Sequence, residues 1–505
     1  MRQILQPSLR DLAPEILCLR SLLLLLIWAV CRKVYAEEAP SAGPLFSEYK
    51  LTLGPGRRSQ VMGPLFYEEQ QGSEHVWAFP PLVSRAEDPE AELKEFDFLY
   101  PLLTYDCYGA QHRWQFFQFI SLTGGPMPEE SNRERFSLFP IYFQQRSSDP
   151  VDDYTAVFPF YGHLRHRFFH DEIFFVAFPF YARTRKHEVV TDNYLYPFFD
   201  RERGPGERGW QCWPLAGYNH KEVTTRTNDF NEAQTVAGHD VRYMLWPFYL
   251  HSTTGIGTSE QATNLVSFPF FSKERSPKRD STSALWLFQH VNDREKKYRE
   301  WDLPWPLIEF ARGEGKTANR VIPFYDRVQI PQHEENSIFW PIYKHNHDWP
   351  APEDRQRTRV LFWVYSNMRE KNLETGSERQ RVDGWPLLLH TRDFTGNDRW
   401  QFLALIEAFV PGAHKIERDY SPLWSLWVSE KNPRSGASSQ SLLWNLYRHE
   451  VTRTTRKTSF LLGLFQSESD AEGRHVRLFY IRLGKGRKFA GAQELYGVSG
   501  PQQQN

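Results

Sequence analysis

Between residues 139 and 199 the chain repeats one tetrapeptide four times, as Phe139-Pro140-Ile141-Tyr142, Phe158-Pro159-Phe160-Tyr161, Phe178-Pro179-Phe180-Tyr181 and Tyr196-Pro197-Phe198-Phe199. The four prolines of these copies are almost evenly spaced along the chain. A motif that recurs at such a nearly fixed spacing is typical of a repeat architecture. We therefore predict the fold from this repeat.

Related tetrapeptides extend the repeat in both directions. Copies with a proline occur at 79–82, 100–103, 213–215, 246–249, 268–271, 305–308, 322–325, 340–343 and 385–388. Copies without a proline, such as 116–119 and 285–288, fill gaps of nearly two units, and most copies in the C-terminal third lack the proline. The pattern predicts roughly 22 units between about residues 60 and 485.

Each unit has the alternation of a β-strand. Apolar side chains alternate with a mixed set along 153–167, 172–185 and 240–251, which is the period of a strand with one apolar face. Gly-, Asp- and Asn-rich stretches such as 203–206 and 394–398 have the composition of turns. A strand of roughly 9–11 residues and a turn fill one unit, which predicts an all-β antiparallel meander of roughly 20–24 strands. The prolines would then lie at strand centres, where proline is normally excluded, so we expect a bulge in each strand.

A sheet of this size must close or split, because long open edges aggregate. We expect closure as a transmembrane β-barrel. In that barrel Phe160, Phe180, Phe248 and Phe324 would contact lipid, and Tyr161, Tyr181, Tyr249 and Tyr325 would face the lumen. Two alternatives are a soluble array of several sheets, such as a propeller, and a β-solenoid of parallel coils.

The ends of the chain predict export. Residues 1–36 combine Arg2, Arg10 and Arg20 with a short apolar run and the small-residue site Val34-Tyr35-Ala36, which is the pattern of a signal peptide. We therefore divide the chain into a signal peptide (1–36), a lead-in (37–60), a single β-repeat domain (61–485) and a polar C-terminal tail (486–505).

Composition excludes several function classes. The chain has 505 residues, of which 38 are Phe, 23 Tyr and 17 Trp, and its net charge is -1. This balance argues against nucleic acid as a partner. Beyond the leader only Cys107 and Cys212 remain, so the chain is no disulfide-stapled scaffold, and these two thiols either form one disulfide or stay unpaired.

Motifs that could carry chemistry have simpler explanations. Residues 204–209 match GxGxxG but contain a proline and precede no helix pattern, so we predict a turn there, and 313–317 lack the first glycine of a phosphate loop. We interpret His163, His166 and His170 with Asp171 as solvated, and His345 and His347 with Asp348 as a slightly better metal candidate. Glu309 and Asp326 are expected to pair with Arg312 or Arg327.

These observations predict an exported envelope protein without a catalytic, cofactor or metal site and with an unknown binding site. We expect an outer-membrane β-barrel that contacts lipid and acts as a channel or as a structural or assembly component. The alternative is a soluble periplasmic or surface scaffold that binds a polymer or a partner protein along its aromatic face.

Overall fold

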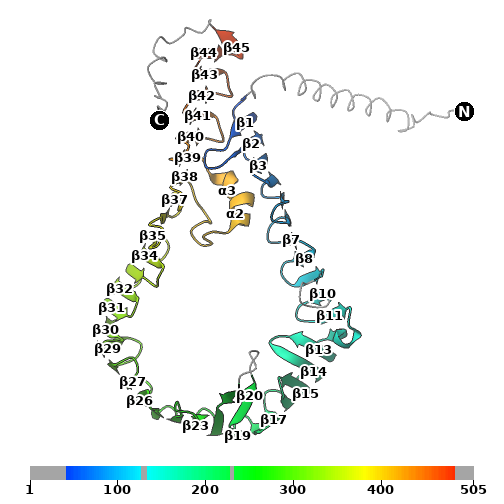
Figure 1. The fold of residues 1–505 in the computed structure, drawn as a ribbon, viewed down its shortest axis with the longest axis vertical. Coiled ribbons are helices and arrows are strands. Elements are labelled where there is room, and N and C mark those ends of the chain that lie inside the picture. Colours follow the sequence, from blue (N-terminus) through cyan, green and yellow to red (C-terminus); the bar gives the residue numbers. More distant parts are fainter. Residues whose placement is uncertain (1–40, 127–132, 228–232, 472, 484–505) are drawn as a thin grey trace, which may run out of the picture. The chain divides into compact units, whose positions relative to one another are not determined.

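The computed structural model describes residues 41–126, 133–227, 233–471 and 473–483. Almost all regular structure in these ranges is β-strand, and consecutive strands follow one another in chain order (Figure 1). The predicted signal peptide and the predicted C-terminal tail lie outside the described residues. The chain divides into a terminal unit, residues 1–80 with 425–505, and a central unit, residues 81–424.

The terminal unit contains strands from both ends of the described chain. Its strands are β1 (Phe46–Lys50), β2 (Gly56–Val61), β3 (Phe66–Gln71), β4 (Glu74–Phe79), β39 (Trp427–Asn432), β40 (Ala437–Leu442), β41 (Tyr447–Val451), β42 (Arg456–Phe460), β43 (Phe465–Asp470), β44 (Gly473–Leu478) and β45 (Ile481–Leu483). The predicted lead-in therefore includes β1 and the start of β2.

Polar side chains join the two groups of strands in the terminal unit. Thr52 Oγ1 donates a hydrogen bond to Ser439 Oγ at 2.7 Å, and Asn445 Nδ2 donates to Ser47 Oγ at 2.9 Å. The guanidinium of Arg448 lies 3.3 Å from the centre of the Tyr49 ring. These contacts hold together segments from opposite ends of the described chain.

The central unit is an antiparallel meander in which each strand pairs with the next. Its first half consists of β5 (Val83–Asp88), β6 (Leu93–Phe98), β7 (Leu103–Tyr108), β8 (Gln111–Phe116), β9 (Ile120–Gly124), β10 (Arg133–Leu138), β11 (Tyr142–Ser147), β12 (Tyr154–Val157), β13 (Tyr161–Arg167), β14 (His170–Val176), β15 (Tyr181–Lys186), β16 (Val189–Tyr194), β17 (Phe199–Gly204), β18 (Glu207–Cys212) and β19 (Ala216–Lys221). A short 3₁₀ helix, η1 (Pro150–Asp152), precedes β12.

The second half continues from β22, which pairs with β19. A separate hairpin, β20 (Thr224–Thr227) and β21 (Ala233–Val236), is inserted between them. The remaining strands are β22 (Gly238–Met244), β23 (Tyr249–Ile256), β24 (Ala262–Ser267), β25 (Phe271–Arg275), β26 (Arg279–Ala284), β27 (Phe288–Asp293), β28 (Tyr298–Asp302), β29 (Ile308–Gly313), β30 (Thr317–Val321), β31 (Tyr325–Ile330), β32 (His333–Ile338), β33 (Tyr343–Asp348), β34 (Glu353–Val360), β35 (Tyr365–Asn372), β36 (Glu378–Gly384), β37 (Leu388–Arg392) and β38 (Asp398–Phe402). Two short helices follow, α2 (His414–Asp419) and α3 (Ser421–Trp424).

The predicted all-β antiparallel meander is confirmed, but each repeat contains two strands instead of one. Residues 153–167, predicted as a single strand, form β12, a turn at 158–160 and β13. The sheet consequently has 43 strands in the described chain, not 20–24, and most of them are about six residues long. In the copies from residue 100 to 325 the proline tetrapeptide starts in a turn and ends at or next to the first residue of the next strand, so no bulge is needed at a strand centre. Apolar and polar residues alternate in the strands on both sides of each apolar turn. In the sequence, the two short strands and the turn therefore look like one long strand.

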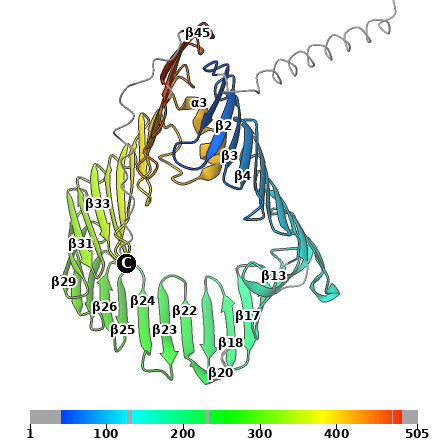
Figure 2. The same ribbon diagram turned by 45° about the horizontal axis from the view of Figure 1, so that its top comes forward.

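In the central unit all strand pairings are antiparallel, which excludes a solenoid of parallel coils. The strands from β5 to β38 form one continuous sheet, which differs from an array of separate blades. Closure of the sheet into a barrel stays a prediction. Figure 2 shows β22 to β25 lying side by side, with their connecting turns at two opposite edges.

The apolar core is small. One cluster on β11 to β15 comprises Phe143, Tyr154, Ala156, Leu164, Phe175 and Ala182, and a second comprises Ala311, Ala318 and Val328. Elsewhere in the described sheet the buried side chains are mostly polar or charged, such as Asp192, Glu309 and Asp383. Most large apolar side chains are exposed instead, and they gather in the turns.

Candidate membrane-binding edge

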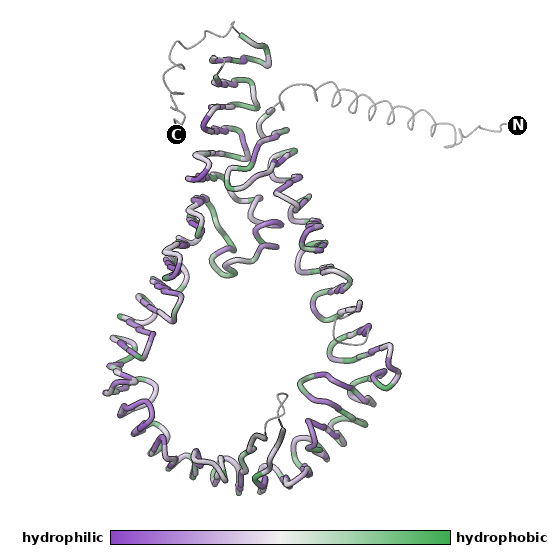
Figure 3. Tube along the Cα trace, viewed as in Figure 1, coloured by the Kyte–Doolittle hydropathy of each residue, from purple (hydrophilic) through white to green (hydrophobic). Residues whose placement is uncertain are grey.

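Alternate turns of an antiparallel meander emerge at the same edge of the sheet. In the central unit one edge carries turns that are almost wholly apolar, and the other carries turns rich in Gly, Pro and charged residues. Apolar and polar segments therefore alternate along the chain (Figure 3). We call the first edge the apolar edge and define it by the turns at 99–102, 117–119, 139–141, 158–160, 177–180, 195–198, 213–215, 245–248, 268–270, 285–287, 303–307, 322–324, 339–342, 361–364 and 385–387.

The side chains at the tips of these turns are open to solvent. Phe160 and Phe180 are 69% and 65% exposed, and Phe248 and Phe324 are 55% and 58% exposed. A contiguous apolar surface of this kind marks an interaction site in a soluble protein. The four tyrosines predicted to line a lumen, at 161, 181, 249 and 325, are the first residues of the strands that follow these turns. The four phenylalanines thus lie in the turns and the four tyrosines at the starts of the strands, so the two sets occupy different positions along the strand direction.

Backbone hydrogen bonds join most of the apolar turns to their neighbours. In the turn 177–180, Ala177 N donates to Phe160 O and Phe178 N donates to Pro159 O, both at 2.6 Å. Phe180 N bonds within the turn to Ala177 O at 2.9 Å, and Pro179 has no N–H. Every backbone donor of this turn is therefore satisfied without water, which is the condition for placing backbone in a lipid environment.

The same bonding recurs along the edge. Pro179, Pro214, Pro323 and Pro386 each accept at their carbonyl from the backbone N–H of Tyr196, Trp246, Trp340 and Ala404 respectively, at 2.7–2.9 Å. Where a turn has a proline, its ring nitrogen carries no N–H that would need a partner, and the proline carbonyl remains available to the next turn. The proline peptide bonds in these turns are cis.

Aromatic rings pack against one another from turn to turn beside these bonds, with tilted ring planes. The ring centres of Phe158 and Phe178 are 5.2 Å apart, and those of Phe178 and Tyr196 are 5.5 Å apart. The Trp213 and Trp246 rings continue the row at 6.0 Å. These separations lie in the favourable range for aromatic pairs. The edge is therefore an ordered apolar row and not a set of independent loops.

The strands beyond the edge carry paired charges. Asp192 is completely buried and accepts hydrogen bonds from Arg183 Nε at 2.6 Å, from the Tyr181 hydroxyl at 2.9 Å and from Arg203. Burial alone would raise the pKa of Asp192, but the hydrogen bonds from Arg183, Tyr181 and Arg203 outweigh it and lower the pKa. The sheet is thus amphipathic along its strands, with apolar turns at one edge and ion pairs away from it.

The residues after β38 depart from the repeat and contact the start of the central unit. Glu407 is buried and accepts hydrogen bonds from Ser421 Oγ at 2.6 Å and from Trp424 Nε1 at 3.0 Å. Burial raises the pKa of Glu407, but its hydrogen bonds outweigh that effect and lower the pKa. Arg418 Nη1 on α2 bonds Glu95 Oε2 on β6 at 2.6 Å, which links two segments that are distant in the sequence.

The structure does not bring the predicted histidine candidates together. His163 Nε2 lies 3.9 Å from Glu172, whereas His166 Nε2 lies 3.8 Å from Asp152. His345 bonds Thr358, and His347 Nε2 lies 2.9 Å from Asp354. The remaining members, His170, Asp171 and Asp348, bond respectively to Phe168 O, to the backbone N–H of His187 and to His333.

Other sequence-based expectations have mixed outcomes. The predicted ion pairs of Glu309 and Asp326 form with Arg320, at 2.8 Å and 3.0 Å, and not with Arg312 or Arg327, because Arg320 lies opposite both carboxylates in the ladder. Cys107 and Cys212 are both free thiols. Of the turn predicted at 204–209, only 205–206 lie between β17 and β18, because β18 already begins at Glu207. Residues 313–317 span the turn between β29 and β30.

Sequence reasoning missed the apolar edge, although a signal for it was present. Proline is excluded from ladder positions, so regularly spaced prolines within alternating apolar stretches indicate turns. No helix in the described ranges is both long and apolar enough to cross a bilayer. A comparison with known proteins found no protein-family model and no curated protein that matches this chain.

Proposed function

We propose that this chain is a membrane-associated structural protein that inserts the apolar edge of its sheet into one leaflet of a lipid bilayer. The observation that carries the proposal is the row of turn-to-turn hydrogen bonds, such as Phe178 N to Pro159 O. Exposed apolar side chains alone would suit any partner, but a satisfied backbone suits a medium without water.

The energetics favour insertion. Removing a large apolar side chain from water contributes roughly 1.5–3 kcal/mol. Several turns that insert together would therefore hold the protein at the surface of a bilayer. Trp and Tyr prefer the headgroup region, and the apolar edge carries Trp246, Trp305 and Trp340 beside its phenylalanines.

Strand length and charge favour an inserted edge over a spanning barrel. A six-residue strand is about 20 Å long, whereas a spanning strand needs roughly 9–11 residues. Charged side chains occur on both faces of the sheet, for example Arg183 and Arg203 on one face and Glu309 and Lys344 on the other. The strands would accordingly lie outside the hydrocarbon. The predicted leader at 1–36 supports an envelope membrane as the location.

Vesicle flotation tests the proposal with a matched pair of variants. The full chain is mixed with phosphatidylcholine–phosphatidylglycerol vesicles and centrifuged through a density gradient. F180D/F248D changes two exposed tips of the apolar edge, whereas F169D/L373D changes two exposed apolar residues on turns at the opposite edge. We expect the wild type and F169D/L373D to float and F180D/F248D to remain at the bottom.

Two results would overturn the proposal. One is flotation of F180D/F248D to the same extent as the wild type. The other is a wild-type protein that stays at the bottom and forms oligomers that F180D/F248D does not form, because the apolar edge would then bind a second copy of the chain.

A further inference from the structure

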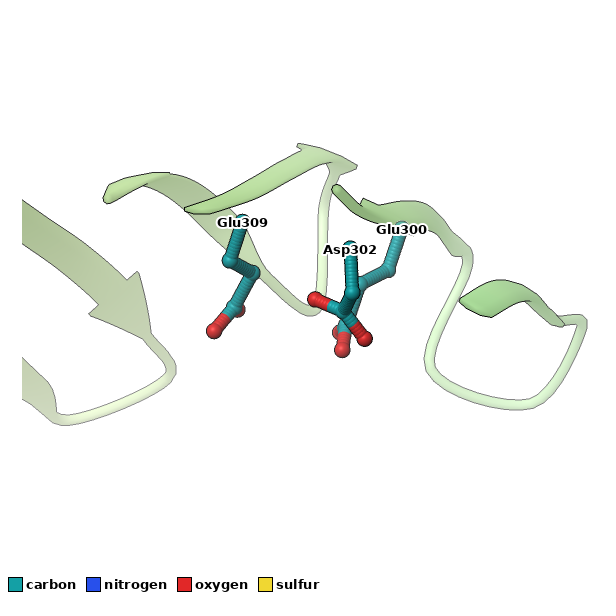
Figure 4. Close-up of side chains that lie close together, drawn as sticks. All are labelled: Glu300, Asp302 and Glu309. Atoms are coloured by element: carbon teal, nitrogen blue, oxygen red, sulfur yellow. The ribbon is translucent and has the colours of Figure 1, made fainter. Parts of the chain in front are cut away.

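Three carboxylates converge on the hairpin of β28 and β29. Asp302 and Glu309 lie directly opposite each other in the ladder, and Glu300 is two residues from Asp302 on the same face. Figure 4 shows the three side chains on the same side of the hairpin. One oxygen from each carboxylate lies within 4.8 Å of the corresponding oxygens of the other two.

Asp302 is the unusual member of this cluster. Its side chain is 1% exposed, and neither carboxylate oxygen has a hydrogen-bond partner among the described residues. An isolated buried carboxylate is strongly unfavourable, so it must gain a proton or a cation. Burial, followed by repulsion from Glu300 and Glu309, raises the pKa of Asp302 to about 6. Asp302 thus supplies an unpartnered and almost fully buried carboxylate to the cluster.

The neighbouring cations are engaged by other carboxylates. Lys316 Nζ lies 2.6 Å from both Glu300 and Glu309. Arg320 binds Glu309 at 2.8 Å and Asp326 at 3.0 Å. Four carboxylates thus share two basic side chains, which leaves two negative charges. One divalent cation would balance them.

We propose that Glu300, Asp302 and Glu309 bind an oxygen-seeking divalent cation, with Ca²⁺ as the best match. The donors are carboxylate oxygens alone, which hard cations prefer, and no thiolate or imidazole contributes. Two ligands on opposite sides of a Ca²⁺ ion are about 4.6–5.2 Å apart, since each Ca–O bond is about 2.3–2.6 Å. Water would complete the coordination, because the side chains of Glu300 and Lys316 remain 13% and 21% exposed.

The cation would displace the amino group of Lys316 from Glu300 and Glu309. Lys316 can turn toward solvent on its flexible stem, whereas Asp302 is held at the end of β28. Asp302 and Glu309 therefore flank the apolar turn 303–307, which joins the two strands. This inference is independent of the membrane proposal, because the carboxylates lie on the face of the sheet.

Isothermal titration of the full chain with Ca²⁺ tests the site. D302N keeps the shape of the side chain and removes a buried charge, so it is expected to fold. Its matched control is D383N, which changes a buried aspartate that Arg381 already binds. We expect D302N to weaken Ca²⁺ binding at least about tenfold, D383N to leave it unchanged, and K316M, which removes the competing cation, to strengthen it.

A thermal shift measurement tests whether Asp302 binds a cation or a proton in the folded protein. With Ca²⁺ at pH 7.5 the wild type should unfold at a higher temperature, and D302N should not respond. The proposal is overturned if the wild type binds no Ca²⁺, or if D302N binds it as tightly as the wild type does. It is also overturned if Ca²⁺ leaves the unfolding temperature of the wild type unchanged, whether or not D302N is more stable than the wild type.

Discussion

The backbone N–H of Phe178 donates a 2.6 Å hydrogen bond to the carbonyl of Pro159, in the preceding apolar turn. This bond continues the ladder between β13 and β14 into the turn region, since Tyr161 and Val176 form the pair at that end of the ladder. The bond thereby holds the apolar turns 158–160 and 177–180 beside each other. The apolar edge follows from repetition of this one relationship along the sheet.

The first prediction concerns how deeply the two edges of the sheet enter the membrane. A fluorophore attached to the introduced thiol of F180C should be quenched by lipid-borne spin labels, and one attached to K186C should not, because Lys186 ends the same strand at the opposite edge. Cys107 and Cys212 are changed to Ser in both proteins. Equal quenching in the two variants would contradict edge-first insertion.

The second prediction concerns Glu407. E407A leaves the hydroxyl of Ser421, the indole N–H of Trp424 and the amide of Gln401 without their buried acceptor. We expect a loss of about 3 kcal/mol in the free energy of local unfolding of residues 404–424, measured by hydrogen exchange. E417A removes an exposed carboxylate from α2 and should leave the exchange unchanged. Equal protection in E407A and E417A would disprove this role of Glu407.

The third prediction concerns the contact of α2 with β6. Arg418 binds Glu95 and Asp97, and Lys415 Nζ bonds Asp106 Oδ1 at 2.5 Å. R418A leaves buried Asp97 with one basic partner fewer, so limited proteolysis should cleave within residues 404–424 several times faster. R299A, which removes an exposed arginine from β28, serves as the control. Indistinguishable cleavage rates in R418A and R299A would show that the ion pairs do not hold α2.

The fourth prediction concerns pH. Burial raises the pKa of Asp200 to about 6, against an opposing hydrogen bond with Gln211. The folded state then holds a proton between about pH 4 and 6 that the unfolded state has lost, so stability falls as pH rises through this window. D200N should be less sensitive to pH, with a gain in unfolding temperature over the wild type at pH 7.5 that disappears near pH 4. The same pH profile for both proteins would show that Asp200 is ionised without cost.

The sequence by itself determined the repeat and the all-β fold class. A nearly constant repeat period, with alternation on either side of each Phe-Pro or Trp-Pro pair, was enough to predict an all-β antiparallel meander. It located polar turns such as 203–206 and 394–398 but not the apolar ones, because a turn made of Phe, Pro and Phe lacks the Gly and Asn that usually mark one. Glu309 and Asp326 were singled out correctly as paired acids, but cross-strand register gave them Arg320 as a partner.

The tertiary structure alone decided which groups are brought together and which are left without a partner. In the central unit, pairing two strands per repeat moved the apolar tetrapeptides to one edge, and hydrogen bonds join most of the successive turns along it. Arg418 and Glu95 come from distant parts of the sequence, so no local pattern could join them. The isolation of Asp302 likewise depends on where Lys316 and Arg320 point, because a side chain's environment is set by its neighbours in space and not by its neighbours in sequence.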